Sequence, residues 1–153
     1  MKIEYLVLEG SEKSSIEIFD ILKVVGLSQM RRLAWVFFDI IALGQLMDIE
    51  KIQNLKSKGS TIKVVNGDQF IDIMQRIQTD WAVCFAFKSH EDLSFTKEPI
   101  SNPKKMYTQQ SDSAEIEIRS FDGTKIFVFS KNMEVIEKIN NKLKEFVIKR
   151  GKT

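Results

Sequence analysis

The carboxy-terminal part of this chain constrains its fold more than any other segment. Apolar and polar residues alternate over residues 114–120 and again over residues 125–130, and residues 121–124, which contain an Asp-Gly pair, separate the two stretches. Because strand side chains alternate between two faces and Asp-Gly suits a tight turn, this order predicts a β-hairpin. Residues 132–149 repeat apolar side chains at helical spacing, so we expect a long amphipathic helix packed across the hairpin.

The amino-terminal residues predict a strand followed by a helix. Residues 2–8 alternate and end at a Glu-Gly pair. Ser14 stands three residues before Glu17, which is the spacing of a capping box, and apolar residues then recur at helical spacing until Gly26. We expect Gly26 to end this helix, since glycine readily adopts the left-handed conformation that follows a last turn.

The next segment has two interpretations. Residues 33–41 are apolar on both alternating faces, as in a central strand covered on both sides. A buried helix extending to Leu43 fits the same residues, and we favour the strand. The helix would be apolar all round and would need a partner chain or deep burial, which is the main indication of a homo-oligomer in the sequence.

Two more helices and a short strand follow. Asp48 can cap a helix that Gly59 ends, and residues 61–65 form a short β-branched strand. An Asn-Gly pair then supplies a turn, and Asp68 can cap a further helix.

Residues 81–87 give the clearest strand pattern of the first half, with one bulky and one small face. The bulky residues are Trp81, Val83, Phe85 and Phe87, and the small ones are Ala82, Cys84 and Ala86. Because a small face lets a helix backbone approach closely, we expect the Ala-Cys-Ala face to lie beneath a helix. The aromatic face is then expected to fill the main core.

Residues 88–113 show no period and contain both prolines of the chain. A connection of this length is long for a compact domain and is often a binding loop. The candidate partner-binding residues in it are Phe95, Lys97, Lys104, Lys105 and Tyr107.

These elements predict a single α/β or α+β domain over residues 1–153. The expected sheet is mixed, with alternating strand and helix units at the amino end and an antiparallel hairpin followed by a long helix at the carboxy end. One domain suffices, because a chain of 153 residues buries roughly 68 to 70% of its unfolded surface.

The strands at residues 33–41, 61–65 and 81–87 would share one carboxyl edge if they were parallel, and open α/β sheets bind ligands at that edge. The candidate ligand-binding residues expected there are Asp39, Asn66, Gly67, His90 and Asp92.

The residue types that carry chemistry are few. His90 is the only histidine and Cys84 the only cysteine, so we expect no metal site and no cofactor. Extended chain would separate these two residues by roughly 20 Å, and we interpret Cys84 as a buried structural thiol rather than a nucleophile.

Charge and composition bound the partners and the compartment. The net charge of +2 combines 23 basic and 21 acidic side chains, and this balance argues against nucleic acid as a binding partner. The longest apolar run is too short for a membrane span, which needs about 20 residues, and no apolar signal opens the chain. With one cysteine, a soluble cytoplasmic protein is expected.

Two classes of function fit these observations. The first, which we favour, is a non-catalytic protein- or ligand-binding or regulatory module that uses residues 88–113 and the carboxyl edge of the sheet. The second is a small enzyme with Asp39, His90 and Asp92 around a ligand. No usual catalytic motif is present, and this favours binding over catalysis.

Overall fold

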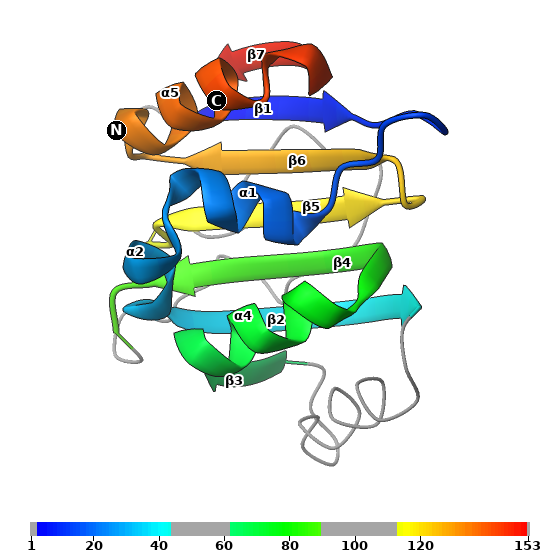
Figure 1. The fold of residues 1–153 in the computed structure, drawn as a ribbon. Helices are drawn as coiled ribbons and strands as arrows, with labels where there is room; N and C mark the ends of the chain where they lie inside the picture. Colours follow the sequence, from blue (N-terminus) through cyan, green and yellow to red (C-terminus); the bar gives the residue numbers. More distant parts are fainter. Residues whose placement is uncertain (1–2, 44–61, 90–112, 153) are drawn as a thin grey trace.

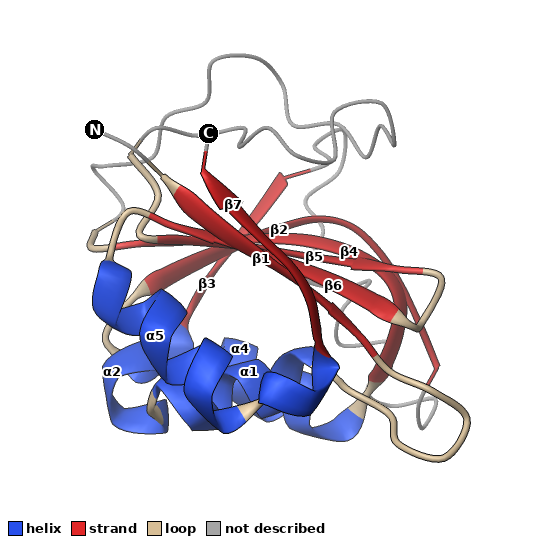
Figure 2. Ribbon diagram, turned by 90° about the horizontal axis from the view of Figure 1, so that it is seen from above, coloured by secondary structure: helices blue, strands red, loops and turns tan. Residues whose placement is uncertain are grey.

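The computed structural model describes residues 3–43, 62–89 and 113–152. All described strands belong to one seven-stranded sheet, and the helices lie on one of its faces (Figures 1 and 2). The predicted α+β class is therefore confirmed. The residues expected to form a helix between Asp48 and Gly59 lie outside the described residues, as do the five candidate residues of the long loop.

The helices and strands follow one another along the chain as shown in Figure 1. They are β1 (Glu4–Glu9), α1 (Ile18–Val25), α2 (Leu27–Arg31), β2 (Ala34–Leu43), β3 (Ile62–Asn66), α4 (Gly67–Arg76), β4 (Gln78–Phe87), β5 (Ile116–Phe121), β6 (Lys125–Ser130), α5 (Met133–Lys142), the 3₁₀ turn η3 (Lys144–Phe146) and β7 (Val147–Lys152). Across the sheet the strand order is β3-β2-β4-β5-β6-β1-β7.

Every pair of neighbouring strands in this sheet is antiparallel, so the predicted mixed sheet is wrong. The unit β3-α4-β4 does run as a strand, a helix and a strand of the same direction. However, β2 lies between β3 and β4 and runs opposite to both. The crossover is a split βαβ arrangement, which local patterns do not distinguish from adjacent parallel strands.

The predicted hairpin is confirmed. β5 pairs with β6, and the turn between them has positive φ at Asp122 (54°) and Gly123 (68°). Positive φ at both central residues is the pattern of a type I′ turn, whose twist matches that of the two strands.

The predicted long helix after the hairpin is wrong at its end. α5 ends at Lys142, and the chain returns through η3 into β7, which pairs with β1. Arg150 and Lys152 of β7 form ion pairs with Glu4 of β1. Pairing with β1 therefore places residues 147–149, which were expected to be helical, in a strand.

The helix caps differ in part from those expected. Glu17, not Ser14, is the N-cap of α1, and its capping box is completed by Asp20. Asn66, not Asp68, caps α4, where its side chain accepts a hydrogen bond from the backbone N–H of Gln69. Gly26 ends α1 with a φ of 126°, as predicted.

Residues 34–43 form a strand, so the strand interpretation is confirmed and the helix alternative is wrong. Trp35 of β2 is buried, stacks on Phe70 of α4 with ring centroids 4.1 Å apart, and donates a hydrogen bond from Nε1 to the carbonyl of Met30. Ala34, Trp35, Val36 and Phe37 are buried within the domain, so this part of the apolar segment needs no partner chain to explain it. The homo-oligomer stays a prediction.

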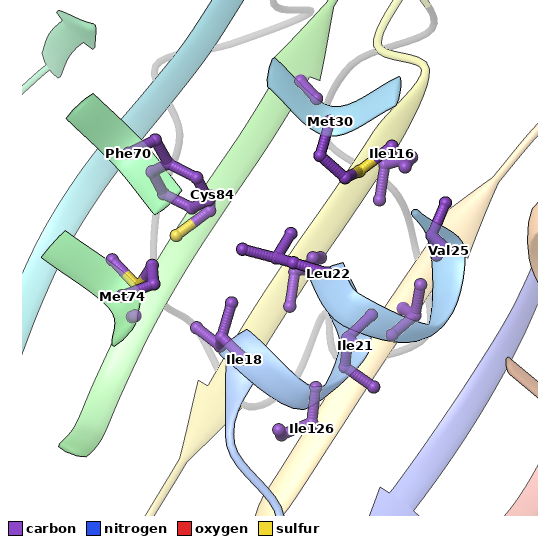
Figure 3. Packing of buried hydrophobic residues seen from close by; sticks show 14 of the residues in the cluster. Ile18, Ile21, Leu22, Val25, Met30, Phe70, Met74, Cys84, Ile116 and Ile126 are labelled. Carbon is purple, nitrogen blue, oxygen red and sulfur yellow. The ribbon is translucent and has the colours of Figure 1, made fainter. Parts of the chain in front are cut away.

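The main core lies between the sheet and the helices. Cys84, with the neighbouring Ala82 and Ala86, faces this core, and Figure 3 shows it near Phe70 and Met74 of α4. The expectation that the Ala-Cys-Ala face of this strand lies beneath a helix is confirmed. The expectation that the aromatic face fills the main core is wrong, because the bulky residues of β4 point to the face that no described helix covers.

No helix in the described ranges is long and apolar enough to cross a membrane.

Candidate functional site

The carboxyl ends of β3 and β4 lie at the same end of the sheet. Ala34, the first residue of β2, pairs with Asn66 of β3 on one side and with Phe87 of β4 on the other. Helix α2 closes this end, since a Cβ atom built on Gly67 would overlap the backbone of Arg31. Only glycine allows this approach, so Gly67 has a packing role here.

The predicted site residues are only partly brought together. Asn66 and Gly67 lie at the end just described, whereas Asp39 lies inside β2 between residues that pair with Val83 and Trp81. The assumption that β2 contributes its carboxyl end to the same edge is wrong, because β2 is antiparallel to its neighbours. His90 and Asp92 lie outside the described residues, so their part in a site stays a prediction.

A pocket of about 240 Å³ opens at this same end of the sheet, where α2, β4, β5 and the start of α5 meet. Its lining residues are Gln29, Met30, Leu33, Lys88, Glu115, Ile116, Asn132 and Val135. Met30, Ile116 and Val135 are buried and belong to the main core. The pocket therefore combines apolar walls with polar and charged groups.

Glu115 lies at the middle of the charged groups of the pocket, and its side chain is 16% exposed. Its Oε1 lies 3.3 Å from Nζ of Lys131 and 3.9 Å from Nζ of Lys88. The Lys88 side chain is 75% exposed, so this longer ion pair contributes little to stability, and the Lys88 ammonium can pair with another anion instead. Two ammonium groups around one carboxylate leave a local charge of +1.

Ser130 organises the polar wall of the pocket. Its hydroxyl donates a hydrogen bond to the carbonyl of Glu115 (2.8 Å) and accepts one from the backbone N–H of Asn132 (3.0 Å). Asn132 in turn caps α5, since its side chain accepts a hydrogen bond from the N–H of Glu134. These bonds fix the start of α5 against the hairpin and so fix the shape of the pocket.

The sequence contained one usable signal for this pocket. The hairpin register pairs Ile116 with Ser130, so the preceding and following residues, Glu115 and Lys131, come together across the two strands. Lys88 and Gln29 carry no such signal, because tertiary folding alone brings α2 and the end of β4 to the hairpin.

A second charged group lies on the face of the sheet that no described helix covers. Glu117 and Arg119 of β5 form an ion pair and are each 2% exposed. The Arg119 guanidinium carbon lies 4.7 Å from the ring centroid of Phe129, a cation–π contact. Both side chains are buried, so this pair is a structural element rather than an accessible site.

The thiol of Cys84 is not available for chemistry. Cys84 is fully buried, and burial raises the pKa of its thiol well above the ordinary range. The interpretation of Cys84 as a buried structural thiol is confirmed. Among the described residues, no group of three or more histidine, cysteine or acidic side chains could hold a metal ion.

The fold and this pocket define an antiparallel α+β protein with a small, charged cleft at one end of its sheet. The chain matches no protein-family model, no curated protein sequence and no solved structure. Function is therefore inferred from the pocket itself.

Proposed function

We propose that this protein is a non-catalytic binding module, and that the pocket at the end of the sheet receives an apolar side chain of a protein partner. The observation that carries the proposal is a small pocket whose lining combines apolar walls with Lys88, and whose Glu115 also pairs with Lys131.

The size of the pocket favours a side chain over a substrate. Its volume of about 240 Å³ is below the roughly 300 to 1,000 Å³ of most small-molecule sites. Protein interfaces often place one anchoring side chain in a pocket of the partner and surround it with polar contacts. The buried walls formed by Met30, Ile116 and Val135 suit such an anchor.

The charges favour an acidic group beside that anchor. Lys88 is exposed and lies 3.9 Å from Glu115, a separation that leaves its ammonium able to turn to a carboxylate of the partner. Lys131 lies closer to Glu115 and also donates a hydrogen bond to the carbonyl of Ser113, so it is more firmly held. The preferred partner segment therefore has an apolar residue next to Asp or Glu.

Affinity capture from the native host, with quantitative mass spectrometry, tests this function. Gln29→Trp places a large ring at the pocket from an exposed position of α2, and Lys88→Glu reverses the charge at its mouth. We expect a stoichiometric partner of the wild-type protein to be lost with both variants.

Two matched variants serve as controls. Ser28→Trp adds the same ring at an exposed neighbouring position that does not line the pocket, and Lys13→Glu reverses an exposed charge elsewhere. Both should retain the partner, and circular dichroism should show all four variants folded. A partner retained by the pocket variants, or no partner of the wild-type protein at all, would contradict the proposal.

We also propose the cytoplasm as the compartment, which fractionation of the host cells tests.

A further inference from the structure

The last strand of the sheet, β7, presents an open edge. It pairs with β1 on one side and is the terminal strand in the order of the sheet (Figure 1). No described strand pairs with its other side, and four of its six residues are exposed. An edge of this kind offers backbone N–H and C=O groups to an added strand.

The edge is already held in place before any partner binds. Nη2 of Arg150 lies 2.9 Å from Oε2 of Glu4 and 2.5 Å from Oε1 of Glu137, so it ties β7 to both β1 and α5. Gly151 lies against the ring of Tyr5, since a Cβ atom there would be 2.5 Å from the ring carbon Cζ. A preformed edge lowers the entropic cost of adding a strand.

The side chains of β7 indicate which strand it would accept. Ile148 is 55% exposed, and the pairing register with β1 skips it, as in a β-bulge. Lys149, Arg150 and Lys152 outnumber the two carboxylates that pair with Arg150 and Lys152, so the rest of the strand keeps a positive charge. A second copy of β7 would place these cations against one another, and like charges on neighbouring strands are destabilising.

We propose that the outer edge of β7 accepts an acidic, extended segment of another protein as an additional strand. Main-chain hydrogen bonds supply the pairing, an apolar residue of the segment covers Ile148, and its carboxylates lie on the same face of the sheet as Lys149. This surface follows the carboxyl end of α5, whereas the pocket lies at the amino end of the same helix. The inference is therefore independent of the proposed pocket function.

A synthetic peptide tests the edge directly. The probe is a capped peptide of about eight residues that alternates Glu and Val, a length that covers a typical strand. Its affinity is measured by isothermal titration calorimetry, and its location by amide hydrogen exchange. We expect binding with new protection of amides in residues 147–152. A peptide with Lys in place of Glu should not bind.

Two comparisons separate strand addition from simple charge attraction. An acidic peptide N-methylated on alternate residues keeps its charge but loses main-chain donors, and we expect its binding to be lost. Lys149→Glu should weaken binding of the unmodified peptide about tenfold, while Lys23→Glu on α1 should not change it. Equal binding of the methylated peptide, protection elsewhere in the chain, or no binding of the acidic probe would overturn the proposal. The methylated peptide keeps the test decisive even if the Lys149 variant fails to fold.

Discussion

Arg150 of the last strand reaches Glu4 of the first strand, with 2.9 Å between Nη2 and Oε2. The Glu4 side chain is only 4% exposed and also lies 3.4 Å from Nζ of Lys152. Two cations of β7 thus compensate one buried carboxylate of β1. This relationship joins segments from opposite ends of the sequence and fixes the position of β7 on the sheet.

The first prediction concerns this ion pair. Glu4→Gln should lower the free energy of unfolding by about 1 to 3 kcal/mol, because hydrogen bonds to a charged group are lost while their donors stay in place. Urea unfolding measures the change, with Glu145→Gln at an exposed position as the control. If Glu4→Gln lowered the free energy of unfolding no more than the control substitution does, the ion pair would not hold β7 on the sheet.

A second prediction concerns Gly67, where α4 begins against α2. Gly67→Ala should destabilise the protein by about 1 to 3 kcal/mol, since the new methyl group would overlap the backbone of Arg31 and force the two helices apart. Thermal unfolding measures the loss, and Ser28→Ala on the exposed surface of α2 is the control. An unchanged midpoint for the Gly67 variant would mean that the helices separate without cost.

A third prediction follows from Glu17, the N-cap of α1. Burial raises the pKa of this carboxyl to about 6, with help from the carboxylates of Asp20 and Asp80, while a hydrogen bond from the N–H of Thr79 opposes the rise. The folded protein therefore binds this proton more tightly than the unfolded chain between pH 4.5 and about 6. Stability from this group should fall as the pH rises through that window.

Glu17→Gln removes this titration and tests the sign. We expect the variant to lose less stability than the wild-type protein between pH 4.5 and about 6, and to be relatively more stable above that range. Urea unfolding at several pH values measures the difference, and Glu12→Gln at an exposed position is the control. Parallel stability curves for the wild-type protein and the Glu17 variant would contradict the assigned pKa.

A fourth prediction concerns the thiol. Cys84 is fully buried and burial raises its pKa, so iodoacetamide should leave the native protein unmodified and alkylate it only in urea. Mass spectrometry of the intact protein distinguishes the two results. Rapid alkylation under native conditions would show that the core opens around α4.

Part of the candidate site could be anticipated from local patterns. The Asp-Gly turn sets the register of β5 and β6, and that register brings Glu115 beside Lys131. The site predicted from parallel strands failed at Asp39, because β2 runs opposite to β3 and β4. Whether two strands pair parallel or antiparallel depends on which strand becomes the neighbour, and the local sequence of one strand does not encode this.

The hairpin and the small face of β4 follow from local sequence, because each depends on alternation or turn chemistry among neighbouring residues. The residues of β2 favoured a strand but also fitted a helix. Tertiary contacts set the antiparallel strand order, and they place residues 147–149, which were expected to be helical, in an edge strand. Those features depend on contacts between distant segments, such as Glu4 with Arg150. Local periodicity carries no information about which distant segment a strand will meet.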